Sequence, residues 1–282
     1  MVSIVLWITI LFLIYNAVLL IFPLKREVIY LNEERAEEFV YSRVSYTKVF
    51  TGSGLIGELR TEQAWRDSFN LFLPYSGSCA GVEIIVLSKK LPEVLFIETN
   101  YIFKGFDRNL TSQLFDRLLY HVRFIFPALL RKHSPKSILK ELIKWTNRST
   151  EKDQTKSLFQ PSVEFFKGIY DELPDPGRFD KVLSSLREYI EAISSKGCQV
   201  VFFEMPIDVD LMNSKLATYQ RDKLISLFPK KKYHWITPNP DDHYNTTDGI
   251  HLDKASVDKY FNYLRQEYNQ VSKAHHSSMT AA

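Results

Sequence analysis

Residues 48–59, KVFTGSGLIGEL, hold the strongest clue to the fold: a short apolar run, a glycine-rich turn and a second apolar segment. A run such as KVFT is typical of a buried β-strand. Gly52, Gly54 and Gly57 allow a tight turn that opens a helix. A strand, a turn and a helix in this order begin a βαβ unit, so the stretch predicts an α/β protein with a parallel sheet.

Four further runs rich in β-branched and aromatic residues extend the same pattern, namely Phe69–Leu73, Val94–Glu98, Gln199–Glu204 and Tyr233–Thr237. Stretches with helical periodicity separate them. Five strands with intervening helices predict a doubly wound, mostly parallel five-stranded sheet of the flavodoxin type. Because roughly 100 residues separate the third and fourth strands, we also expect a helical insertion near residues 106–175.

The insertion contains the apolar stretch Leu114–Leu130, and a basic stretch follows it from Arg131 to Lys144. The favoured interpretation is a core-packed helix followed by a solvated basic helix. The alternative is an element that contacts the membrane surface or a partner protein. This alternative is kept because none of the candidate site residues below falls inside the insertion.

The N-terminal residues Val2–Leu24 contain no charge over 23 positions and are followed by Lys25 and Arg26. A bilayer needs about 20 apolar residues, and a cleavable signal peptide would be shorter and begin with basic residues. We therefore expect an uncleaved transmembrane anchor over residues 1–24. A stalk (25–45), one large domain (46–270) and a disordered tail (271–282) would follow. The two basic residues favour a cytoplasmic domain, although large domains translocate largely regardless of charge.

The composition argues against several classes of protein for this chain. Of the 282 residues, 45% are hydrophobic and 24% are charged, so the chain can bury a core and is not a disordered tail. Lys and Arg number 36 against 33 acidic residues, and this net charge of +3 gives no support for a nucleic-acid partner. Cys79 and Cys198 form no CxxC motif, so we interpret them as small buried residues, with a disulfide left open.

Ser53 lies in the glycine-rich turn, and two functional interpretations compete for it. Gly52, Gly54 and Gly57 match the dinucleotide fingerprint GxGxxG, but no acid stands about 20 residues later to hold a ribose. In the other interpretation Ser53 is a nucleophile, and backbone N–H groups stabilise the negative charge that develops. The simplest role for such a serine is a helix cap.

A nucleophilic serine needs a base and an orienting acid, and the motif DGIH, residues 248–251, offers both. Asp248 and His251 can project side by side from a loop, with the imidazole toward the serine and the carboxylate toward the ring. Their simpler roles are an Asx turn and a histidine at the start of a helix. A metal site is a further alternative, in which Asp241, Asp242 and His243 join Asp248 and His251 as ligands. The irregular spacing of these residues disfavours it.

Together these positions resemble the ordered blocks of the SGNH, or GDSL-type, hydrolase family, with Gly77 after the second strand and Asn100 after the third. The resemblance implies that Ser53 is the nucleophile and that Asp248 and His251 complete its triad. It also implies an oxyanion hole formed by the Ser53 N–H, Gly77 and Asn100. Two blocks depart from the family pattern, because TGS replaces GDS and ETNY replaces GxND.

Such loosened blocks are similar to a membrane-anchored branch of the family that acylates cell-surface polymers, as in alginate acetylation and teichoic-acid D-alanylation. This resemblance implies an extracytoplasmic O-acyltransferase or carbohydrate esterase that uses no cofactor. Its implied partners are a surface polysaccharide and a multi-pass membrane acyltransferase. The alternative is a catalytically silent scaffold that binds glycan or that transferase, and a dinucleotide enzyme is the third possibility.

Overall fold

The structure, a computed structural model, describes residues 2–21, 32–134 and 163–280. The chain forms two compact units, one of Met1–Arg43 with Arg108–Leu158 and one of Val44–Asp107 with Phe159–Ala282. We name them the N-terminal unit and the sheet unit. The expected stalk therefore shares a unit with much of the expected insertion, although the two are far apart in the sequence.

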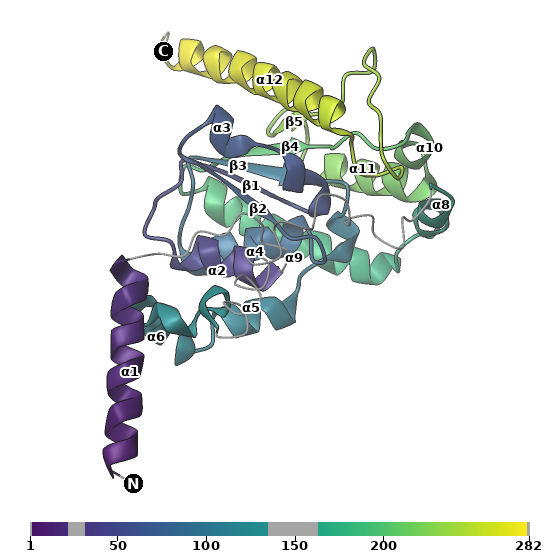
Figure 1. Cartoon of the computed structure of the whole chain (residues 1–282). Helices are drawn as coiled ribbons and strands as arrows, with labels where there is room; N and C mark the ends of the chain where they lie inside the picture. The colour runs from purple at the N-terminus through teal and green to yellow at the C-terminus, as the bar shows by residue number, and fades with distance from the viewer. Residues whose placement is uncertain (1, 22–31, 135–162, 281–282) are drawn as a thin grey trace. The chain divides into compact units, whose positions relative to one another are not determined.

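A sheet of five parallel strands forms the centre of the sheet unit (Figure 1). The strands are β1 (Lys48–Gly52), β2 (Ser68–Phe72), β3 (Val94–Glu98), β4 (Gln199–Phe203) and β5 (His234–Ile236). Their order is β2-β1-β3-β4-β5, so the direction of winding reverses between β1 and β3. The predicted α/β class is confirmed, and each predicted strand end falls within one residue of the observed one.

Helices cover both faces of this sheet, with α4 and α9 on one face and α12 on the other (Figure 1). The helical elements of the sheet unit are η1 (Gly54–Glu58), α3 (Thr61–Ala64), α4 (Ser78–Ser88), η2 (Ile102–Lys104), α8 (Val163–Asp171), α9 (Pro176–Ser194), α10 (Val209–Met212), α11 (Lys215–Leu227) and α12 (Lys254–Thr280). The expected disordered tail is thus helical as far as Thr280. No glycine or proline after Lys254 stops the helix earlier.

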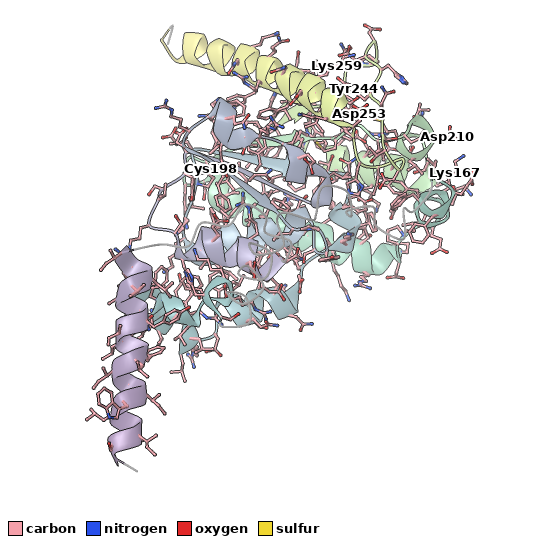
Figure 2. All side chains as sticks on the ribbon, in the orientation of Figure 1. Lys167, Cys198, Asp210, Tyr244, Asp253 and Lys259 are labelled. Carbon is pink, nitrogen blue, oxygen red and sulfur yellow. The ribbon has the colours of Figure 1, made fainter. Side chains whose placement is uncertain are left out.

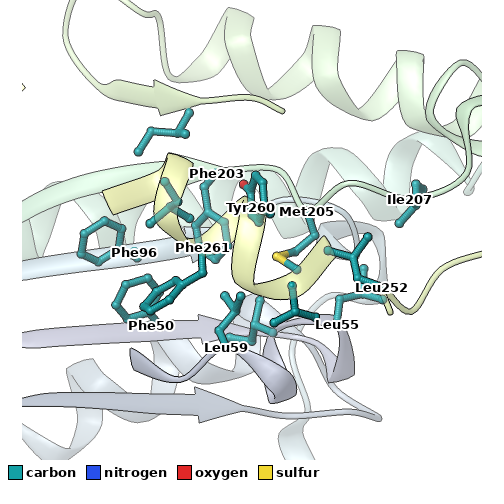
Figure 3. Close-up of a cluster of buried hydrophobic side chains, with 14 of the residues drawn as sticks. Phe50, Leu55, Leu59, Phe96, Phe203, Met205, Ile207, Leu252, Tyr260 and Phe261 are labelled. Atoms are coloured by element: carbon teal, nitrogen blue, oxygen red, sulfur yellow. The ribbon is translucent and has the colours of Figure 1, made fainter. Parts of the chain in front are cut away.

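A cluster of buried side chains joins the α12 face of the sheet to the loops that follow the strands (Figure 3). Phe50 of β1 and Phe96 of β3 stack with ring centroids 4.2 Å apart, and Phe261 of α12 belongs to the same cluster. The cluster also includes Leu55, two residues after Ser53, and Leu252, one residue after His251. Burying each such side chain contributes about 1.5–3 kcal/mol, so hydrophobic packing draws these two loops together.

The turn after β1 differs from the helix that we expected there. It opens the five-residue 3₁₀ helix η1, which contains Gly54 and Gly57, and glycine is a poor former of longer helices. The Asn70 amide donates to the carbonyls of Ile56 (2.6 Å) and Leu59 (3.2 Å). This side chain from β2 satisfies carbonyls at the end of η1, so the turn can stop after one short helix.

The N-terminal unit contains α1 (Val2–Ile21), α2 (Asn32–Tyr41), α5 (Arg108–Leu114), α6 (Leu119–Ile125), η3 (Pro127–Leu129) and η4 (Arg131–His133). Within α1, residues Ser3–Ile21 form a helix long and apolar enough to cross a membrane, and no other described helix meets both conditions. The expected stalk contains α2, which contacts α5 and buries Phe39 and Val40.

The apolar stretch Leu114–Leu130 is not the single core-packed helix that we expected. The Asp116 carboxylate accepts from Leu118 N (3.1 Å) and Leu119 N (3.0 Å), which starts the short helix α6. Pro127 lacks an N–H and begins η3. None of the residues of α6 is buried. Of the basic stretch, Lys136, Lys140 and Lys144 lie outside the described residues.

Candidate active site

The pair Asp248 and His251 is held in a local turn between β5 and α12. Asp248 Oδ2 lies 2.7 Å from His251 Nδ1, and Oδ1 accepts from His251 N (2.8 Å) and Ile250 N (3.0 Å). Gly249 has φ +98°, which favours glycine at this position. Both carboxylate oxygens are therefore used to hold the turn and the imidazole in one arrangement.

The charge on Asp248 is stabilised by the same contacts. Burial alone would raise its pKa, but the hydrogen bonds from His251 and Ile250 outweigh burial and hold the pKa below its usual value. Asp248 therefore accepts from Nδ1 as a carboxylate, and this leaves Nε2 of the same ring as the atom that can take a proton. The His251 side chain is 46% exposed, so a substrate can reach it.

Ser53 occupies the tight turn at the end of β1. Its side chain is 2% exposed, and Oγ accepts from Leu55 N at 3.2 Å as the N-cap of η1. A side chain on Gly52 would place its Cβ 2.7 Å from Glu98 Cβ and 2.8 Å from Glu98 Oε2. Only glycine fits there. Because Gly52 has no side chain, the backbone before Ser53 can approach Glu98 at the end of β3 closely.

The turn that carries Ser53 (the serine turn) and the turn formed by residues 248–251 (the histidine turn) lie close together. No described hydrogen bond joins them. A Cβ built on Gly54, the residue after Ser53, would lie 3.9 Å from His251 Nε2. Among the described side chains, His251 makes its hydrogen bond to Asp248, while Ser53 Oγ caps η1. The triad contact between Ser53 and His251 therefore stays a prediction.

The three expected oxyanion donors all donate within the protein. Ser53 N donates to Glu98 Oε2 at 2.6 Å, and Gly77 N donates to Leu73 O at 2.9 Å in a turn with φ +83°. The Asn100 amide donates to Met205 O (2.9 Å) and accepts from Met205 N (2.8 Å). Asn100 thus ties the loops after β3 and β4 together. An oxyanion would have to share or displace these acceptors.

Glu98, which no sequence motif assigns to the site, contacts the candidate nucleophile directly. It is fully buried, and Oε1 has no hydrogen-bond partner among the described residues. Burial raises its pKa, and the hydrogen bonds from Ser53 offset only part of this effect. The sequence feature that could have identified Glu98 is an acidic residue at the end of the apolar strand VLFIE. Sites in parallel sheets lie at the carboxyl ends of the strands, so an acid there is a candidate site residue.

Two grooves border the histidine turn within the sheet unit. One, of about 490 Å³, is lined by His251 together with Glu58, Arg60, Thr247, Leu252, Asp253, Lys254, Val257 and Asp258. The other, of about 720 Å³, follows the ends of β4 and β5 and includes Asn239 and Tyr244. Lys259 lies beside Tyr244 (Figure 2), with Nζ 5.3 Å from the ring centroid and 2.8 Å from Asp242 Oδ1. Both grooves offer polar groups to a ligand.

The structure gives little support to a dinucleotide site, a metal site or a disulfide. The five-residue helix η1 presents no long helix N-terminus for the pyrophosphate of a dinucleotide. In the described part of the chain no cluster of three His, Cys, Asp or Glu side chains is arranged for a metal ion, and Asp242 pairs with Lys259 instead. Cys79 and Cys198 are free and buried, and burial raises the pKa of Cys198 to about 12.

Comparison of the chain with protein-family models gives no match, and neither does comparison with curated proteins. The resemblance to the SGNH family therefore depends on the blocks in the sequence.

Proposed function

We propose that the sheet unit is a serine-dependent acyl-transfer domain of the SGNH type, either an O-acyltransferase or a carbohydrate esterase. The observation that supports it best is the ordered pair of Asp248 and His251, whose free Nε2 lies beside the turn that carries Ser53. A histidine oriented by a carboxylate and placed next to a serine is the arrangement of nucleophilic acyl transfer.

In the proposed reaction Ser53 Oγ attacks the acyl carbonyl while His251 Nε2 takes the hydroxyl proton. His251 then gives this proton to the leaving alcohol, and Asp248 stabilises the imidazolium that exists in between. The acyl-enzyme passes its acyl group to a sugar hydroxyl or to water. Because Oγ caps η1 in this structure, the serine must first rotate from Leu55 N toward His251.

The grooves support a polar acceptor over a long acyl chain. The groove beside His251 carries charges of both signs, and the second groove combines the Tyr244 ring with amide and carboxylate groups. An aromatic face beside hydrogen-bonding side chains suits a sugar, which has apolar C–H faces and a rim of hydroxyls. We therefore propose a surface polysaccharide as the substrate and acetyl as the acyl group.

We further propose that α1 anchors the protein and that the sheet unit lies outside the cytoplasm, where a polysaccharide would be available. A multi-pass acyltransferase in the same membrane would supply the acyl group. A reporter that is active only outside the cytoplasm, fused after Ala282, should be active. If only a cytoplasmic reporter is active there, this substrate is wrong.

The direct test of the chemistry is a fluorophosphonate probe applied to the full-length protein in detergent. We expect one label on Ser53, none in Ser53→Ala and slow labelling in His251→Ala, because the base no longer activates the hydroxyl. Ser214→Ala is the matched control, since Ser214 caps α11 through a hydrogen bond of the same 3.2 Å length. This variant should lose a similar cap energy, about 1 kcal/mol, and keep the label.

A catalytically silent scaffold is the second candidate, and one specific observation favours it. The Ser53 N–H, the Gly77 N–H and the Asn100 amide already have partners within the protein, and Ser53 is almost completely buried. A wild-type protein that binds glycan but takes no label at Ser53 would favour this candidate.

A further inference from the structure

A cluster of apolar side chains outside α1 is exposed in the N-terminal unit. They fall within twelve consecutive residues, with the exposed fractions Leu118 79%, Leu119 43%, Val122 36%, Phe124 40%, Ile125 64% and Leu129 38%. Single exposed apolar residues are normal on a soluble surface, but a contiguous group marks a site of interaction.

The exposed group follows the geometry of α6. Leu118, Val122 and Ile125 are spaced as i, i+4 and i+7, so they share one face of the helix. Tyr120 and Phe124 lie next to α2, with ring centroids 6.0 Å and 4.9 Å from that of Tyr41. One side of α6 thus packs on its own unit while the other presents a continuous apolar stripe.

Contacts to α1 fix the level at which this stripe lies along the anchor. Asn16 Oδ1 accepts from Ala128 N (3.0 Å), and Tyr15 Oη donates to His133 O (2.8 Å). The rings of Phe12 and Phe126 are 5.4 Å apart. At 1.5 Å per residue, Asn16 lies about 7.5 Å, and Phe12 about 13.5 Å, before the end of α1 at Ile21.

We propose that residues 118–130 form a second membrane contact, in which α6 and η3 enter the lipid beside α1. This inference rests on the proposed anchoring by α1. If that helix spans a bilayer whose hydrocarbon core is about 30 Å thick, a segment that packs against Phe12 and is hydrogen-bonded to Asn16 lies below the membrane surface. The occupant of the exposed stripe is then lipid.

The backbone of this segment meets the main condition for entering lipid, namely that its N–H groups are bonded within the protein. Phe126 N donates to Val122 O (2.9 Å), and Leu129 N donates to Phe126 O (3.0 Å). Pro127 has no N–H, and the next one, that of Ala128, is accepted by the Asn16 side chain. Asn16, a polar residue in the anchor, is 4% exposed and so satisfies a donor instead of facing lipid.

Basic side chains border the apolar stripe. Arg117 precedes it, and Arg131 and Lys132 follow it. Each Lys or Arg near an anionic lipid surface contributes about 1 kcal/mol of attraction. The stripe of Leu118, Val122 and Ile125 is apolar, and Arg123, which lies in the same segment, donates to Gln113 O at 2.9 Å. An apolar stripe with basic residues beyond both ends fits lipid chains flanked by anionic headgroups.

The test places a single fluorescent label on the full-length protein in vesicles of phosphatidylcholine and phosphatidylglycerol, with Cys79 and Cys198 replaced by alanine. NBD is attached to Ile125→Cys or Leu118→Cys. Ile14→Cys in α1 is the membrane reference. Val209→Cys in the sheet unit is the matched control, since Val209 is 65% exposed and Ile125 64%. Doxyl lipids then report lipid contact, and iodide reports water contact.

We expect the labels at positions 125 and 118 to be quenched by doxyl lipid, as at position 14, and the label at 209 to be quenched by iodide. Iodide quenching at 125 and 118 with lipid quenching at 14 overturns the inference and leaves a solvated or protein-binding surface. Iodide quenching at 14 as well overturns the anchoring itself.

A second variant tests the role of Asn16. Asn16→Leu removes the acceptor of Ala128 N and should lower lipid quenching at position 125. Thr9→Val is its control, because the Thr9 hydroxyl donates within α1, to Val5 O at 2.9 Å. Unchanged quenching in Asn16→Leu would show that this contact does not set the depth of the segment, which contradicts the argument from depth.

Discussion

The candidate site has two halves that are built in different ways. We call Asp248 and His251 the histidine half, and Ser53, Gly77 and Asn100 the serine half. Asp248 and His251 belong to one four-residue turn, and their hydrogen bonds lie within it. Ser53, Gly77 and Asn100 come from the ends of three strands, and each is bonded to a residue that is not part of the triad. The first half has the arrangement that the proposed proton transfer needs, whereas the donors of the second half are used within the protein.

Burial explains this difference. His251 is almost half exposed, so water can satisfy Nε2. Ser53 and Asn100 are almost completely buried, and a buried donor without a partner costs about 1–3 kcal/mol. In the absence of substrate the serine half is stable only if its donors are used internally. In the proposed reaction a substrate oxygen must therefore compete with Glu98, Leu73 or Met205 for these donors.

The largest expected effect comes from breaking the histidine half. His251→Ala removes the proposed base, and turnover of an acyl ester should fall by about 10⁴–10⁶. Asp248→Asn leaves the shape of the turn but favours the wrong tautomer, so a fall of about 10⁴ is expected. Initial rates on an acetylated oligosaccharide measure both.

If Ser53, His251 and Asp248 act as one unit, as we propose, Ser53→Ala combined with His251→Ala should be no slower than the slower single variant. Melting temperatures close to that of the wild type would show that the variants fold. Effects that multiply in the double variant would mean that Ser53 and His251 do not work together.

Two neighbouring glycines give a smaller effect that separates folding from chemistry. Gly52→Ala forces Cβ against Glu98 and should cost about 1–3 kcal/mol of stability. Gly54→Ala makes only ordinary contacts, 3.5 Å to Pro74 Cβ and 3.9 Å to His251 Nε2. We expect it to keep the melting temperature yet slow probe labelling, because the methyl group lies between the two halves. Equal melting temperatures for the two variants would contradict the close approach of Glu98 to the serine turn.

The sequence predicted the parts of this protein that depend on local patterns. Apolar runs of four to six residues identify all five strands, and the signal is clearest for β3, which is buried along its whole length. The DGIH turn was also readable, since its hydrogen bonds are formed within four residues. Both are short-range features of the chain.

The parts that depend on contacts between distant residues were not predicted. Asn70 ends η1 from 14 residues away, and Glu98 meets Ser53 N from 45 residues away. The association of α2 with α5 joins segments about 70 residues apart. Such contacts arise only when the sheet order and the packing are known, so no local pattern reveals them.

The smallest expected effect concerns Glu98, the residue on which the serine half closes. Glu98→Gln keeps an oxygen that can accept from Ser53 N but removes the ionisable group. Because burial raises the pKa of Glu98 in the folded protein, its contribution to stability is fully present below the ordinary pKa of a glutamate. This contribution is lost as the pH rises through the raised value.

The wild type should therefore lose stability relative to Glu98→Gln as the pH rises, and the two proteins should be closest at acidic pH. Melting temperatures of both proteins from pH 4 to pH 9 measure this difference. The ratio of the wild-type labelling rate of Ser53 to that of Glu98→Gln should also fall as the pH rises, because a charged carboxylate on the Ser53 N–H opposes the negative charge of the tetrahedral intermediate. Melting temperatures that change with pH in the same way in both proteins would show that Glu98 does not titrate in this range. The contact between Glu98 and Ser53 would then depend on packing and not on the charge of Glu98.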